Sequence, residues 1–177
     1  MFPELTSDRF YLKQVQPEDL SFIYEGLSDP VAMPHYGVYF YSLEETKKQL
    51  EWYDKNWNEG TGIIWKVVSK QTGDNVGVIS VYNYKKEHNK AELGYWLLPK
   101  FWKHGIASEV LKPVIDYWQN EKELHRMEAF IETENEASVR LLQKAGFTLE
   151  GTMHDCEIKF GKYISLHIYS LIFTSTS

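Results

Sequence analysis

The sequence predicts an α+β fold in which a mixed, mostly antiparallel sheet is covered by helices. Several β-rich runs follow one another with only short turn signals between them, which favours neighbouring antiparallel strands. Later segments carry apolar residues at helical spacing and are each followed by another β-rich run, so these helices serve as crossovers. The 177 residues contain no linker-like stretch and no internal repeat, and we expect a single domain over residues 1–177.

The first part of the chain predicts one strand and two helices. Residues 5–14 form the strand, and a short helix follows over residues 17–27, because proline and two acidic residues favour a helix start. The second helix begins with a capping box, in which Ser42 caps the helix and Glu45 lies three residues on. This helix is expected to extend to about Trp57.

The middle of the chain predicts three strands, at residues 63–69, 75–84 and 90–98. Turn signals at residues 72–74 and 87–89 separate them. The short links favour antiparallel pairing of these three neighbours.

An amphipathic helix is predicted from about Gly105, because apolar residues recur there at helical spacing. These residues are Ala107, Val110, Leu111, Val114 and Trp118. Pro113 lies inside the pattern and removes one helical hydrogen bond, so we expect either a kink or an early end of the helix.

The last part of the chain predicts a strand, a helix and a hairpin. The strand covers residues 127–132, and Asn135 is a good N-cap for the helix after it. Two final runs, at residues 147–159 and 163–173, meet at Gly161 as antiparallel strands.

Composition excludes several functional classes. The 25 Asp and Glu residues outnumber the 19 Lys and Arg residues, and a net charge of −6 disfavours nucleic acid as a partner. No window approaches the roughly 18 consecutive apolar residues of a membrane span, so no membrane partner is expected. The lone cysteine, Cys156, cannot form an intramolecular disulfide, which fits a reducing, cytoplasmic location. No histidine shows metal-ligand spacing, so we expect no metal.

One strand-to-helix junction carries the clearest chemical signal. The strand ending at residue 98 leads through Pro99 to a loop with Gly105, and then to a helix. Backbone N–H groups at a helix N-terminus bind phosphate or pyrophosphate well. An ordinary strand-to-helix turn is the alternative at this stage.

Taken together, several segments resemble the GNAT superfamily of acyl-CoA-dependent N-acetyltransferases, and within it the RimJ/RimL-like branch of ribosomal-protein N-terminal acetyltransferases. The resemblance covers nearly the whole chain. The matching segments are residues 5–12, the strand with Glu92, residues 105–107, residues 135–147, residues 161–163 and residues 169–171.

The resemblance implies a GNAT fold with a seven-stranded sheet and about four helices. It also implies that the sheet opens between its fourth and fifth strands, where the pantetheine arm of acetyl-CoA lies. The implied CoA-binding residues are Leu97, Leu98, Trp102, Lys103, His104, Gly105, Ile106, Ala107, Ser108, Asn135 and Ser138. Backbone amides from Lys103 to Ser108 would bind the pyrophosphate, and those near Leu97 and Leu98 would face the pantetheine and acetyl groups. The loop departs from the family pattern, since Trp102 stands where Gln or Arg is usual.

The implied reaction is direct attack of an amine on the thioester through a tetrahedral intermediate. Glu92 matches the family's glutamate base, and a solvated strand carboxylate is its alternative reading. Many relatives place a tyrosine near the thiol where this chain has Leu142. Ser138 matches a serine that the RimL-like branch offers to the thiol instead, although it and Asn135 also suit helix capping.

The implied function is transfer of an acetyl group from acetyl-CoA to a primary amine, with a protein N-terminal α-amine as one acceptor. Two alternatives are acetylation of a small amine, such as an antibiotic, a polyamine or an amino sugar, and a non-catalytic CoA-binding module. We expect the acceptor near residues 33–41 and the helix face of Trp52, Tyr53 and Trp57. A homodimer through the terminal hairpin is left open.

Overall fold

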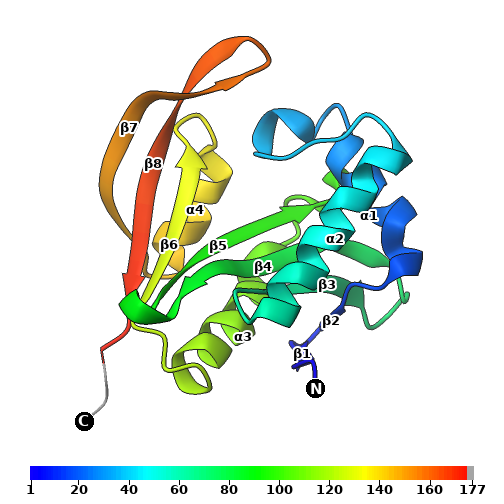
Figure 1. Ribbon diagram of the computed structural model, residues 1–177, viewed down its shortest axis with the longest axis horizontal. Helices are drawn as coiled ribbons and strands as arrows, with labels where there is room; N and C mark the ends of the chain where they lie inside the picture. The colour runs from blue at the N-terminus through cyan, green and yellow to red at the C-terminus, as the bar shows by residue number, and fades with distance from the viewer. Residues whose placement is uncertain (175–177) are drawn as a thin grey trace.

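The computed structural model describes residues 1–174 and contains, within them, one eight-stranded sheet with four α-helices (Figure 1). The strands are β1 (Leu5–Thr6), β2 (Phe10–Gln14), β3 (Ile63–Ser69), β4 (Asn75–Lys85), β5 (Lys90–Leu97), β6 (Arg126–Glu132), β7 (Thr148–Lys159) and β8 (Lys162–Ile172). The helices are α1 (Leu20–Ser28), α2 (Leu43–Glu59), α3 (Ile106–Asn120) and α4 (Glu136–Lys144).

The predicted α+β fold is confirmed, with one more strand than expected. The predicted first strand is divided into β1 and β2 by a turn in which the Ser7 amide donates to the Phe10 carbonyl at 2.9 Å. The two parts then pair with each other in antiparallel fashion. The strand order is β1-β2-β3-β4-β5-β6-β8-β7, and only the β5–β6 pair is parallel.

The sheet opens between β5 and β6. These two strands pair only at Lys90–Arg126, Ala91–Met127 and Glu92–Glu128. Beyond these pairs β5 stays bonded to β4 and β6 to β8, so the two halves of the sheet diverge (Figure 1). This is the opening predicted between the fourth and fifth strands of a seven-stranded sheet.

Ion pairs fasten the closed end of this opening. Glu128 is buried and accepts hydrogen bonds from Arg126 at 2.7 Å and from Lys90 at 3.2 Å. Burial acts to raise the pKa of Glu128, but these two partners outweigh it and lower the pKa. Arg126 also binds Glu150 on β7. The network therefore joins β5, β6 and β7 where the strands are still paired.

Two apolar clusters cover opposite faces of the sheet. The larger packs α3 and α4 against one face and includes the fully buried Trp118 and Leu142. The smaller packs α1 and α2 against the other face and includes Ile23 and Trp96. Alternation along β5 thus sends Leu93 toward the first cluster and Trp96 toward the second.

Helix ends and one helix interior differ in detail from expectation. Ser42 Oγ accepts from the Glu45 amide at 3.2 Å, as a capping residue should. The Glu45 carboxylate, however, accepts from the Tyr41 amide rather than from Ser42. Helix α3 continues through Pro113 to Asn120, so the early end, one of the two expected effects of the proline, does not occur. Buried apolar residues on both sides of the proline compensate for the lost hydrogen bond.

Candidate active site

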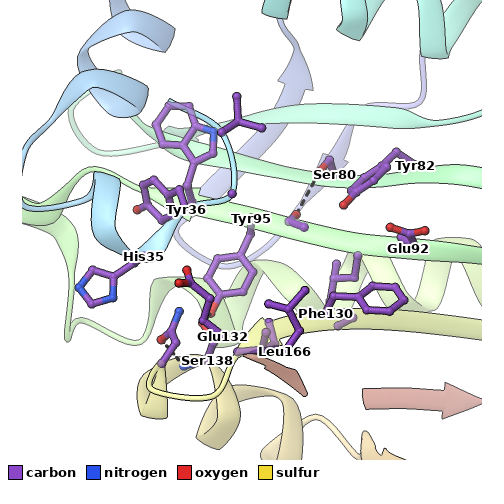
Figure 2. A pocket seen from close by; sticks show the side chains of 18 of the residues that line it. His35, Tyr36, Ser80, Tyr82, Glu92, Tyr95, Phe130, Glu132, Ser138 and Leu166 are labelled. Atoms are coloured by element: carbon purple, nitrogen blue, oxygen red, sulfur yellow. Dashed lines mark hydrogen bonds between the residues drawn. The ribbon is translucent and has the colours of Figure 1, made fainter. Parts of the chain in front are cut away.

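The opening between β5 and β6 leads into a cavity of about 810 Å³. That volume lies in the range of small-molecule sites. Its lining comes from β4, β5, β6, α2, α4, the β7–β8 hairpin and residues 35–38 (Figure 2). The cavity therefore lies where the sheet lacks hydrogen bonds between its two halves.

Three of the predicted site residues meet in this cavity: Glu92, Asn135 and Ser138. Glu92 lies on β5, while Asn135 and Ser138 lie at the start of α4. The predicted residues Leu97, Leu98 and 102–108 do not line the cavity. They form the end of β5, the loop that follows it and the first turn of α3.

Glu92 is partly buried and held by an irregular part of the neighbouring strand β4. Asn83, at a positive φ of 52°, donates to Glu92 Oε1 at 2.5 Å. Burial, followed by the charge of Glu92, raises the pKa of Tyr82 to about 12, so this phenol stays protonated beside the carboxylate. The Glu92 carboxylate, held by Asn83, thus lies at the wall of the cavity.

The start of α4 forms the opposite wall. Asn135 Oδ1 accepts from the Ser138 amide at 3.2 Å, so Asn135 caps the helix as predicted. The Ser138 hydroxyl is buried and lies 2.6 Å from the hydroxyl of Tyr95 on β5 (Figure 2). Burial raises the pKa of Tyr95.

Tyr95 is a site residue that sequence reasoning missed. The signal was present, because alternation along β5 places Tyr95 on the face opposite to Glu92, toward α4. What the sequence did not contain was the distance between this strand and the start of α4. The structure supplies it.

The loop before α3 has the geometry of an anion site. Lys103 and Gly105 both have positive φ, at 64° and 71°, and such turns make concave arrays of N–H groups. Within residues 1–174, no acceptor is found for the backbone N–H groups of residues 103–108. Arg9 donates to the His104 carbonyl at 3.1 Å and pairs with Glu109 at 2.6 Å, which holds the loop in place. The loop thus fits the predicted phosphate role.

The amides at the end of β5 are less available than the sequence suggested. The Leu98 amide donates to the Val76 carbonyl at 3.0 Å, so it has no hydrogen left for a ligand. The Leu97 amide donates to the Tyr36 hydroxyl at 3.1 Å, and this hydroxyl donates to the Leu97 carbonyl at 2.6 Å. The Trp102 indole also donates to that carbonyl, at 2.9 Å. A pantetheine contact at the Leu97 amide therefore requires displacement of Tyr36.

Part of the region that is expected to bind the acceptor lines the cavity. His35, Tyr36, Trp52 and Tyr53 line it. Trp57 does not, and packs instead against Phe2 with ring centroids 5.1 Å apart.

The tip of the β7–β8 hairpin is fastened over this region. Lys159 is buried and donates to the Pro34 carbonyl at 2.7 Å and to Glu132 at 2.6 Å. The rings of Phe160 and Tyr39 also contact, with centroids 4.8 Å apart. Figure 1 shows the hairpin tip beside the segment that precedes α2. Three segments far apart in sequence therefore enclose one end of the cavity.

Among residues 1–174, no group of three or more His, Cys, Asp and Glu side chains is placed to hold a metal ion. No helix within the same residues is long and apolar enough to cross a membrane.

Comparison with known proteins identifies relatives of both sequence and fold. The family described as "Acetyltransferase (GNAT) domain" matches residues 9–148. The chain is 32% identical, over 97% of its length and 98% of the relative's, to Bacillus subtilis (strain 168) "Uncharacterized N-acetyltransferase YoaA".

Two solved structures share the fold at lower identity. Ribosomal-protein-S5-alanine acetyltransferase from Vibrio fischeri has a TM-score of 0.87 at 19% identity, covering 99% of each chain. Spermidine N-acetyltransferase from Vibrio cholerae, solved with CoA and spermine, has a TM-score of 0.82 at 20% identity, covering 93% of this chain and 95% of that one. The resemblance to the GNAT family inferred from the sequence is thus confirmed by the family match and the 32% identical relative, and the solved structures share the fold.

Proposed function

This chain belongs to the GNAT family of acetyl-CoA-dependent N-acetyltransferases, and on that premise we propose that it acetylates a primary amine held between Glu92 and the hairpin tip. The observation that carries the proposal is the divergence of β5 and β6, which leaves Glu92 on one wall of a cavity and Ser138 on the other. Together the two walls offer a base for the amine and a hydroxyl group for the thioester.

The residues present fit acetyl-CoA as co-substrate. The N–H groups of residues 103–108, at the N-terminus of α3, suit its pyrophosphate. The opening between the strands suits the pantetheine arm, and the cavity has room for the acetyl group together with an acceptor. The thioester supplies the activated acetyl group.

Glu92 is the base candidate in this proposal. A carboxylate that accepts the amine's proton, directly or through one water, lets the nitrogen attack as the free base. Asn83 fixes the position of the carboxylate by its 2.5 Å hydrogen bond. The protonated Tyr82 beside it does not compete for the proton.

A protein N-terminal α-amine is the acceptor that this arrangement favours. Its pKa is near roughly 7.7–8.0, against roughly 10.4 for a lysine side chain, so a single carboxylate suffices as base. The cavity wall also carries aromatic side chains, including Trp52 and Tyr82, on which a cationic group can rest.

A small polyamine is the second candidate, and one residue favours it. Glu157 on β7 lines the same cavity as Glu92 and is exposed, with no ion pair among residues 1–174. A second ammonium group on the acceptor would pair with this carboxylate.

Cytoplasmic location and homodimer formation stay predictions. The free and exposed Cys156 is consistent with a reducing compartment.

Release of the CoA thiol from acetyl-CoA tests the function. The panel contains a peptide with a free α-amine, the same peptide with a blocked α-amine and one lysine, a polyamine and an amino sugar. We expect thiol release with the free α-amine peptide and none with the blocked one, and Glu92→Gln serves as the matched inactive control. Release only with polyamine would favour the second candidate. CoA binding without turnover of any amine would indicate a non-catalytic module.

A further inference from the structure

The hydroxyl of Tyr36 occupies the edge of β5 at one end of the cavity. Tyr36 lies at the cavity wall (Figure 2). The Leu97 amide donates to its hydroxyl at 3.1 Å, and the hydroxyl donates to the Leu97 carbonyl at 2.6 Å. One side-chain oxygen therefore bonds both backbone polar groups of a strand residue. A neighbouring strand would offer the same pair of hydrogen bonds, one accepted and one donated.

The backbone groups of Leu97 point into the opening between β5 and β6. Peptide groups alternate in direction along a strand, and the Leu98 amide points toward β4, where it donates to the Val76 carbonyl. The groups of Leu97 therefore point the other way, and β6 pairs with β5 only as far as Glu92. Without Tyr36, the Leu97 amide would need another acceptor at this edge.

The pantetheine arm of acetyl-CoA has the chemistry to take over these bonds. The arm is an extended chain that carries amide groups, and extended chains bind strand edges through such groups. The loop at residues 103–108, which suits the pyrophosphate, follows the end of β5. An arm that enters the cavity from that loop passes Leu97, so the arm and Tyr36 compete for the same amide.

The backbone near Tyr36 is held in place, so its side chain is the part that gives way. Lys159 donates to the Pro34 carbonyl at 2.7 Å and fixes the turn before Tyr36. The Leu97 carbonyl keeps a partner when the hydroxyl leaves, because the Trp102 indole donates to it at 2.9 Å. Displacement therefore frees the Leu97 amide and leaves no orphaned carbonyl.

We propose, on the basis of the proposed function, that Tyr36 is an internal competitor of the pantetheine arm. In the free protein its hydroxyl holds the edge of β5 at Leu97, and CoA binds as its arm displaces this hydroxyl. The contact lowers the affinity for CoA. Because the hydroxyl bonds Leu97 again when the arm leaves, it also favours release of CoA after the transfer.

Calorimetric titration with two ligands tests this competition. One ligand is CoA, and the other is its nucleotide portion, 3′-phosphorylated ADP, which has the diphosphate and lacks the pantetheine arm. Wild type is compared with Tyr36→Phe, which loses the hydroxyl and keeps the ring. Tyr24→Phe is the matched control, because the Tyr24 hydroxyl also donates to a backbone carbonyl, that of Tyr41 at 3.3 Å, and Tyr24 does not line the cavity.

Tyr36→Phe should lower the Kd for CoA by about three- to tenfold. This is the gain expected when a ligand no longer displaces about one net hydrogen bond. The Kd for the nucleotide portion should stay at the wild-type value, and Tyr24→Phe should leave both constants unchanged. A contact that served binding would give the opposite sign, since removal of its hydroxyl would weaken CoA binding.

A spectroscopic measurement covers the case in which Tyr36→Phe fails to fold. 3-Fluorotyrosine is placed at position 36, where it keeps both the ring and the hydroxyl, and its fluorine NMR signal is followed. CoA should shift this signal, because the hydroxyl leaves Leu97. The nucleotide portion should leave the signal in place.

An unchanged or higher Kd for CoA in folded Tyr36→Phe would overturn this inference. An equal gain for the nucleotide portion or in Tyr24→Phe, or a fluorine signal that CoA does not move, would overturn it as well. In each case the proposed function stands if wild type releases the CoA thiol with an amine. Failure of wild type to bind CoA would overturn both.

Discussion

Replacement of Lys159 by Met removes the charge that fastens the hairpin tip while keeping an unbranched apolar chain. The Lys159 side chain is 8% exposed and its partner Glu132 is 19% exposed. Loss of one member of a buried ion pair typically costs about 3–5 kcal/mol. Because Glu132 retains some contact with water, we expect a loss of about 2–3 kcal/mol in the free energy of unfolding.

Urea unfolding of a double-mutant cycle measures this loss. Lys159→Met with Glu132→Leu removes both charges, and the pair of changes should cost less than Lys159→Met alone, by about 1 kcal/mol or more. Lys47→Met is the matched control, since its partner Glu44 is 80% exposed, and it should cost at most about 0.5 kcal/mol.

Lys159→Met should weaken binding of the amine acceptor more than binding of CoA. Lys159 holds Pro34 beside the cavity, whereas the loop at residues 103–108 lies outside the cavity lining. We expect a higher KM for the amine and an unchanged Kd for CoA. Additive costs at Lys159 and Glu132, with no coupling energy, would refute the reasoning, and so would a weakened CoA affinity with normal amine kinetics.

Three further predictions concern the base, an ion pair and a tight contact. Glu92→Gln should lower turnover by about 10²- to 10⁴-fold at unchanged CoA affinity, and normal turnover from pH 6 to about 9 would remove Glu92 from the mechanism. Hydrogen bonds from Arg126 and then Ser170 lower the pKa of Glu150 from 4.5 to about 2, so its contribution to stability is present above pH 4.5 and is lost as the pH falls toward 2. Urea unfolding of wild type and Glu150→Gln between pH 6 and 3 should therefore converge, and a constant difference would contradict this. Gly26→Ala places a Cβ 2.1 Å from Trp96 Cζ3 and should cost about 1–3 kcal/mol, measured against Gly151→Ala, whose Cβ meets nothing within 4 Å.

Local patterns in the sequence predicted most of the secondary structure. The strand at residues 63–69 was predicted with its observed bounds, and both strands of the terminal hairpin were predicted to within one residue at every end. Asn135 acts as the expected cap. These features depend on neighbours in the chain, so period and capping residues suffice to find them.

Contacts between distant segments could not be predicted in the same way. The Tyr95–Ser138 contact joins residues 43 apart, and the Lys159–Pro34 contact joins residues 125 apart. None of these four residues is of an unusual type for the segment in which it lies. The engagement of the Leu98 amide with Val76 also depends on how β4 meets the end of β5, which the strand pattern does not specify.

A crystal structure of the protein with bound CoA tests the central claim most directly. The account predicts that the pyrophosphate contacts the N–H groups of residues 103–108 and that the sulfur lies between β5 and β6, within hydrogen-bond distance of Tyr95 or Ser138. CoA bound elsewhere, with β5 and β6 enclosing no ligand, would contradict it.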